Sequence, residues 1–201
     1  MNNELLKKYF KLLYSDLNKV EFTYQGKNSI YMPLCSSSID HCISINVLKD
    51  QNITTSMYAL VRPAVENYLR AIWVKYSGEV GTMNADSTEM HFPKKIEHLI
   101  EVVTQEKPEL ESEYSLKSVM EHTFMNMHDF THGGIQSIAR QYDDEGAILT
   151  YERSEEEITS IVKLSVLISQ LSYSEIIKDN TANEVLNTEE INKLAKELIG
   201  L

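Results

Sequence analysis

Residues 53–76 carry apolar side chains at intervals of three and four, the spacing of one face of an α-helix. Such a broad apolar face predicts the central helix of a bundle. Pro63 lies within the segment and is expected to kink or break the helix, because proline lacks a backbone N–H. The apolar residues, all expected in the core, are Met57, Leu60, Val61, Ala64, Val65, Tyr68, Leu69, Ile72 and Trp73.

Helical spacing recurs along most of the chain. It predicts further helices over the ranges 2–20, 33–47, 93–105, 112–132 and 135–142, with loops at 21–32 and 77–92 and a short extended piece at 147–151. Pro33 is expected in the first turn of its helix. With only 7 glycines and 4 prolines, the chain lacks the many tight turns of an all-β protein.

Two more helices are predicted near the C-terminus. Ser154 and Glu157 have the spacing of a capping box, which opens a helix. After a polar linker, Thr188 is expected to cap a last amphipathic helix that Gly200 follows. We therefore expect an all-α bundle of about six or seven helices. Residues 1–180 would form the bundle domain, and residues 181–201 a linker and a helix that packs on this bundle, on a second copy or on a partner.

The net charge of −11 is concentrated in the second half of the chain. Residues 1–100 hold 11 basic and 10 acidic residues, whereas residues 101–201 hold 8 basic and 20 acidic residues. Such an acidic half repels phosphate backbones, so RNA contact would require a local basic pocket or a partner. The acidic half would either keep the protein soluble or form a docking surface for a partner with a basic surface.

The remaining composition predicts a cytoplasmic protein. The two cysteines, Cys35 and Cys42, are seven residues apart, too far for a disulfide within one helix, and are expected to be buried and reduced. The N-terminus lacks the order of a signal peptide, and no apolar run approaches the ~18 residues of a membrane span.

Arg62, Glu66 and Arg70 follow one another at intervals of four, so they form one polar row on the most apolar predicted helix. Arg–Glu pairs at this spacing are ordinary on helix surfaces. Charges on a central helix, however, need partners or a cleft. The row is therefore either a structural ion network or one wall of a functional cleft.

A second cluster surrounds two histidines, His128 and His132, one helical turn apart. Imidazoles transfer protons near neutral pH, and a pair at this spacing also suits a metal ion. Gly133 and Gly134 remove side-chain bulk beside them, so a ligand could approach. If the two clusters converge, the arginines would hold a phosphate while a histidine moves a proton, with Arg140 as a further phosphate ligand and Asp129 and Glu66 as orienting groups.

Two stretches together resemble a known group of bacterial helical proteins of unknown function. Residues 60–73, LVRPAVENYLRAIW, resemble its "RPxxE…RxxW" helix, and residues 130–134, FTHGG, followed by Arg140, resemble its "THxG…R" motif. This group is allied to the HEPN-like superfamily of small α-bundles, many of them dimers. The resemblance implies that the chain forms a homodimer or binds a partner protein. It also implies that the chain acts as a ribonuclease or another effector in antiviral defence or in a toxin–antitoxin system.

The sequence departs from the HEPN ribonuclease motif, in which an arginine precedes a histidine by four to six residues on one helix. No arginine here precedes a histidine at that spacing, so enzymatic activity stays open and a site would have to come from two helices. Two alternatives remain: a non-catalytic interaction module that docks through its acidic half, and a metal-binding bundle. The latter resembles DinB-like proteins, with His41, His128 and His132 as ligands. Neither the effector hypothesis nor the interaction module implies a cofactor.

Overall fold

A computed structural model describes residues 2–77, 92–93, 96–108, 111 and 154–200. The described residues form a π-helical turn, η1 (Trp73–Ser77), and six α-helices, with no strand among them. The helices are α1 (Asn3–Leu17), α2 (Asn28–Asp50), α3 (Thr54–Ile72), α4 (Ile96–Glu106), α8 (Glu155–Lys178) and α9 (Thr188–Ile199). The all-α prediction is confirmed for this part of the chain. The predicted helices at 112–132 and 135–142 and the extended piece at 147–151 lie outside it.

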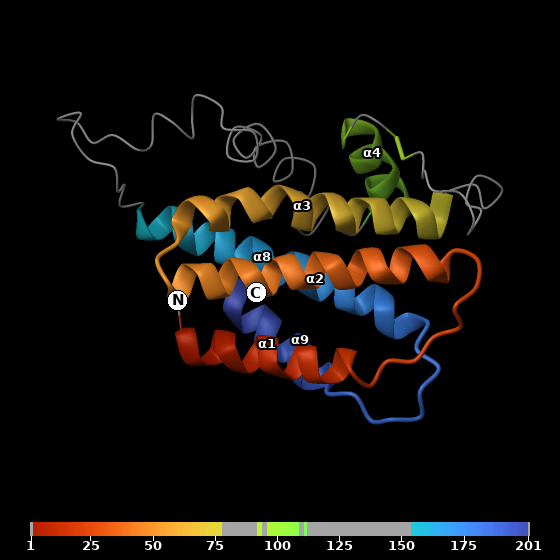
Figure 1. Cartoon of the computed structure of the whole chain (residues 1–201), viewed down its shortest axis with the longest axis horizontal. Coiled ribbons are helices and arrows are strands. Elements are labelled where there is room, and N and C mark those ends of the chain that lie inside the picture. Colours follow the sequence, from red (N-terminus) through yellow and green to blue (C-terminus); the bar gives the residue numbers. More distant parts are fainter. Residues whose placement is uncertain (1, 78–91, 94–95, 109–110, 112–153, 201) are drawn as a thin grey trace.

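The hairpin of α2 and α3 forms the middle of the bundle (Figure 1). Helix α2 packs against both α3 and α8, and α4 packs against α3 and η1. Helix α9 packs against α8 and α1, so the last helix covers its own bundle. Its buried residues, Ile191, Leu194, Ala195 and Leu198, form the apolar stripe that the sequence shows.

Buried tyrosines and serines hold the helices together. Tyr9 of α1 is fully buried, and its hydroxyl lies 2.9 Å from the Ser169 hydroxyl of α8. The Ser38 hydroxyl of α2 donates to the Ala64 carbonyl of α3 at 2.7 Å. Because serines are small, they let the backbones of neighbouring helices approach, and the hydroxyls of the buried serines Ser38, Ser165, Ser169 and Ser172 all find partners.

Asp16 ties three parts of the fold together. Its carboxylate is fully buried at the end of α1. It accepts hydrogen bonds from the Tyr173 hydroxyl of α8 at 2.8 Å and from both the backbone and side-chain nitrogens of Asn187, at 2.5 and 2.7 Å. Asn187 immediately precedes α9, so this one carboxylate fixes where the last helix begins.

The structure contradicts the expected position of Pro33 in a first helical turn and the expected break at Pro63, but does not test the alternative of a kink at Pro63. Helix α2 begins at Asn28, so Pro33 lies inside it, and the predicted loop at 21–32 ends early. The first turn forms without the proline, because the Lys27 carbonyl accepts from the Tyr31 backbone N–H at 2.9 Å. Helix α3 runs unbroken through Pro63, so the predicted break does not occur. Burial on both flanks of Pro63 outweighs the single missing hydrogen bond.

Helix ends follow the sequence more closely. The Ser154 side chain caps α8 by accepting from the Glu157 backbone N–H at 3.2 Å, as predicted. Gly200 ends α9 with a φ of 87°, a conformation that favours glycine. The predicted cap of α9 is wrong by one residue. Thr188 is the first helical residue, and its hydroxyl lies 3.3 Å from the Tyr173 hydroxyl instead of capping the helix.

Cys35 and Cys42 are both free and buried, as expected. Burial raises the pKa of both thiols well above the usual range.

Among the described helices, α8 has the length and composition of a membrane span, although the sequence shows no continuous apolar run. More than half of that window is buried inside the bundle, as in the core helix of a globular domain.

Candidate functional site

The Arg62–Glu66–Arg70 row lies along one side of α3, as the spacing predicts. Arg62 Nε donates to Glu66 Oε1 at 2.7 Å, and Arg70 Nη2 donates to Glu66 Oε2 at 3.1 Å. The opposite side of the helix is buried and holds Val61, Val65, Tyr68, Leu69 and Ile72. Two guanidinium groups therefore share one carboxylate, and the row has a net charge of +1.

The row is neither sealed in the core nor fully exposed. The side chains of Arg62, Glu66 and Arg70 keep 24%, 16% and 36% of their area accessible. A buried ion network would have every donor satisfied. Within the described structure, however, the buried Nε of Arg70 has no acceptor within hydrogen-bond distance. A buried donor without an acceptor is costly, and an oxygen of a bound anion would satisfy it.

Two aromatic side chains adjoin Arg70. The Arg70 guanidinium lies over the Phe92 ring, 5.2 Å from its centroid. The Phe92 and Trp73 centroids are 6.0 Å apart with an interplanar angle of 64°, so the two rings meet edge to face. Both side chains are partly exposed. Trp73 packs against the hydrophobic core as expected but is only partly buried, whereas Tyr68 is fully buried.

The second predicted cluster lies outside the described residues. This applies to His128, Asp129, His132, Gly133, Gly134 and Arg140, and their convergence with the α3 row stays a prediction. His41, the third ligand of the metal alternative, is partly buried on α2. Burial lowers its pKa, although Asp40 opposes the shift. Over the described ranges, no three His, Cys, Asp or Glu side chains are grouped to hold a metal ion.

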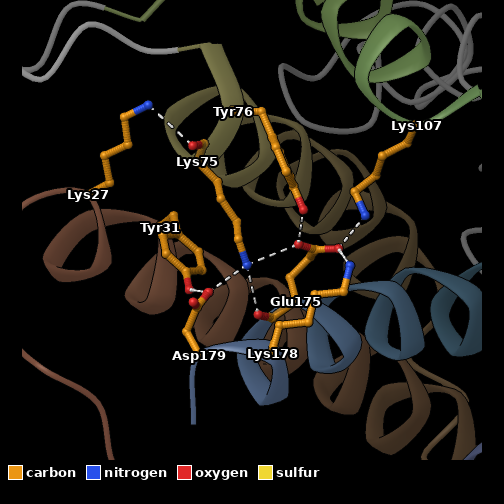
Figure 2. A network of polar contacts seen from close by, with 8 residues as sticks. All are labelled: Lys27, Tyr31, Lys75, Tyr76, Lys107, Glu175, Lys178 and Asp179. Atoms are coloured by element: carbon orange, nitrogen blue, oxygen red, sulfur yellow. Dashed lines mark hydrogen bonds and ion pairs between the residues drawn. The ribbon is translucent and has the colours of Figure 1, made fainter. Parts of the chain in front are cut away.

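The sequence interpretation missed a buried charge cluster around η1, just beyond the C-terminal end of α3 (Figure 2). Its centre is the carboxylate of Glu175 on α8, whose side chain is only 2% exposed. Lys75 of η1 approaches at 3.2 Å, Lys178 donates at 2.8 Å, and the Tyr76 hydroxyl donates at 2.9 Å. Lys107, immediately after α4, also donates to this carboxylate.

The lysines overcome the cost of burying the Glu175 carboxylate. Burial alone would raise the pKa of Glu175, but the hydrogen bonds from Lys107 and Lys178 lower it to about 2. Lys75 extends the cluster to Asp179 at 2.7 Å, and Asp179 also accepts from the Tyr31 hydroxyl of α2. Because four donors saturate the Glu175 carboxylate, the cluster is a structural tie between helices rather than an open ligand site.

The sequence does contain a signal for this cluster. Ile161, Ser165, Ile168, Ser172 and Glu175 follow one another at intervals of three and four on the buried face of α8. A glutamate on such a face needs cationic partners. Lys178 is one such partner, three residues further along α8. The others come from η1 and from the residue after α4, and their spatial proximity cannot be read from local spacing.

A family model matches residues 35–197 of the chain, and its description is a family of unknown function (DUF6988). The match begins within α2 and ends within α9. It includes the α3 row and the Glu175 cluster. No curated protein and no solved structure matches the chain.

Proposed function

The chain belongs to the DUF6988 family, whose function is unknown, and from the chemistry of its own residues we propose that it is an RNA- or nucleotide-directed effector. The proposal includes a HEPN-like bundle and a role in bacterial defence or in a toxin–antitoxin system. In this account, Arg62 and Arg70 hold a phosphate. His132 acts as the base and His128 as the acid, with Arg140 as a further phosphate ligand.

The observation that carries the proposal is the sharing of Glu66 by Arg62 and Arg70, at 2.7 and 3.1 Å. A guanidinium group is a planar fork of donors that matches the oxygens of phosphate. The buried Nε of Arg70 has no acceptor within hydrogen-bond distance, and this unsatisfied donor favours an anionic ligand.

The charge of the chain restricts how such a ligand would bind. A net charge of −11 disfavours contact along a length of RNA backbone. A single partly exposed arginine row suits one or a few phosphates. The proposal therefore concerns local recognition of a nucleotide unit and not coating of a nucleic acid.

The acid–base part of the proposal follows from histidine chemistry. An imidazole near its ordinary pKa accepts and donates protons at neutral pH. If His132 removes the proton of a ribose 2′-hydroxyl, that oxygen attacks the adjacent phosphorus and the bond from phosphorus to the 5′-oxygen of the next nucleotide breaks. His128 would give its proton to that leaving oxygen, and arginines would stabilise the charge that develops on the phosphate. Asp129 and Glu66 would orient the histidines and arginines.

Cleavage of total RNA by the purified protein tests the proposal. The assay compares the wild-type chain with Arg70→Gln, His132→Ala and a charge control, Lys11→Gln, whose lysine is exposed on α1, with and without EDTA. We expect cleavage that resists EDTA, persists in the control and is lost in the other two variants. Cleavage that EDTA abolishes would support the metal alternative. Absence of cleavage in every sample would support the interaction module, and full activity in Arg70→Gln would overturn the role of the row.

A further inference from the structure

The aromatic side chains beside Arg70 are placed to recognise more than a phosphate. Trp73 follows Arg70 by three residues, one helical turn and ~4.5 Å of rise further along. Phe92 contacts both side chains, at 5.2 Å from the Arg70 guanidinium and 6.0 Å from the Trp73 ring. The three side chains therefore form one continuous surface, which we call the stacking surface.

The two aromatic side chains of the stacking surface pack against the hydrophobic core but keep part of their area exposed. The tyrosines of the same helix, Tyr58 and Tyr68, are fully buried, whereas Trp73 and Phe92 are not. At an interplanar angle of 64°, a planar group that stacks on the Trp73 ring meets the Phe92 ring at a steep angle. Part of this aromatic area is exposed beside a cation.

We propose that a nucleobase stacks on Trp73 and contacts Phe92 edge to face, while Arg70 and Arg62 hold the phosphate of the same nucleotide. This inference rests on the proposed function, because it requires a phosphate at the arginine row. Bases stack on aromatic rings and on guanidinium planes in proteins that bind unpaired nucleic acid. The ligand class is therefore a nucleoside phosphate, either free or at an unpaired position of RNA, and not a phosphate without a base.

The chain offers a direct readout, because Trp73 is its only tryptophan. Adenosine monophosphate, ribose 5-phosphate and a short single-stranded RNA are titrated against the full chain while tryptophan fluorescence is recorded. Stacking on Trp73 should change its fluorescence, and ribose 5-phosphate supplies a phosphate without a base. We expect affinity for adenosine monophosphate to be about tenfold higher than for ribose 5-phosphate, the scale of one stacked base.

Substitution of Phe92 separates stacking from phosphate binding. In Phe92→Leu, we expect the ratio of the affinity for adenosine monophosphate to that for ribose 5-phosphate to decrease, because the base loses one of its two aromatic contacts while any effect of Phe92 on Arg70 applies to both ligands. The matched control is Tyr14→Leu, which removes an aromatic side chain that is 55% exposed on α1 and should leave both affinities unchanged. The melting temperature of each variant checks its folding.

The outcomes distinguish the two proposals. If both phosphates bind with equal affinity and Arg70→Gln abolishes binding, phosphate recognition stands and the stacking inference is overturned. If neither phosphate nor RNA binds, the proposed function fails as well. Tighter binding of RNA than of adenosine monophosphate supports the inference with an unpaired RNA strand as the source, whereas preference for adenosine monophosphate supports it with a free nucleotide.

Discussion

Lys75 Nζ lies 3.2 Å from Glu175 Oε2, which joins the turn after α3 to the buried face of α8. The residues are 100 positions apart in the sequence. Lys107 and Lys178 complete the cluster, so a single carboxylate connects the ends of α3, α4 and α8. The packing at this end of the bundle therefore relies on Lys75 and Lys107, which are far from Glu175 in the sequence.

The Glu175 cluster predicts loss of stability in acid. The pKa of Glu175 is about 2 in the folded chain and 4.5 ordinarily, so its carboxylate stabilises the fold fully above pH 4.5. That contribution, about 3 kcal/mol, is lost as pH falls from 4.5 through 2. Glu175→Gln should be less stable at pH 7 and should lose less stability on acidification. Urea unfolding at several pH values measures both, with Glu197→Gln, exposed on α9, as control. An equal pH dependence in Glu175→Gln would contradict the assignment.

Substitution of the buried Asp16 is also predicted to lower the stability of the fold. Asp16→Asn keeps the shape of the side chain but removes one acceptor for Tyr173 and Asn187. Loss of a buried charge-assisted hydrogen bond should cost about 2 kcal/mol. Thermal unfolding should show the loss, whereas Asp40→Asn, exposed on α2, should leave the melting temperature nearly unchanged. Similar melting temperatures for both variants would refute the role of Asp16.

Glu66→Ala distinguishes the two interpretations of the arginine row. Because all three side chains keep contact with solvent, we expect a loss of only about 1 kcal/mol of unfolding free energy. A loss of several kcal/mol, as for a stranded buried charge, would mean that the row is a closed ion network. Chemical denaturation measures the difference, and Lys11→Gln shows the effect of removing an unrelated charge.

The two cysteines are predicted to be unreactive in the folded chain. Burial raises the pKa of both thiols, and reaction with a disulfide reagent requires an accessible thiolate. Labelling should therefore proceed only at the rate at which the bundle opens, and both thiols should react at once in denaturant. Rapid labelling under native conditions would show that α2 is not buried as described.

Local patterns predicted much of the fold. The apolar stripe of α3, the Ser154 cap and the last helix follow from spacing and capping chemistry, which are properties of nearby residues. Pro33 and Pro63 were misjudged because tertiary packing stabilises α2 and α3 around them. The arginine row was predicted because its members share one helix. Phe92, Lys107 and Glu175 were missed because their partners lie on other elements.

Phosphate binding by the α3 row is the central claim, and a phosphorus NMR titration of inorganic phosphate tests it directly. We expect Arg62→Gln and Arg70→Gln to weaken binding and Glu66→Gln to strengthen it, because Glu66 is the anion with which phosphate must compete. Lys11→Gln should bind as the wild-type chain does. Equal affinity in all five proteins, or weaker binding in Glu66→Gln, would contradict the account.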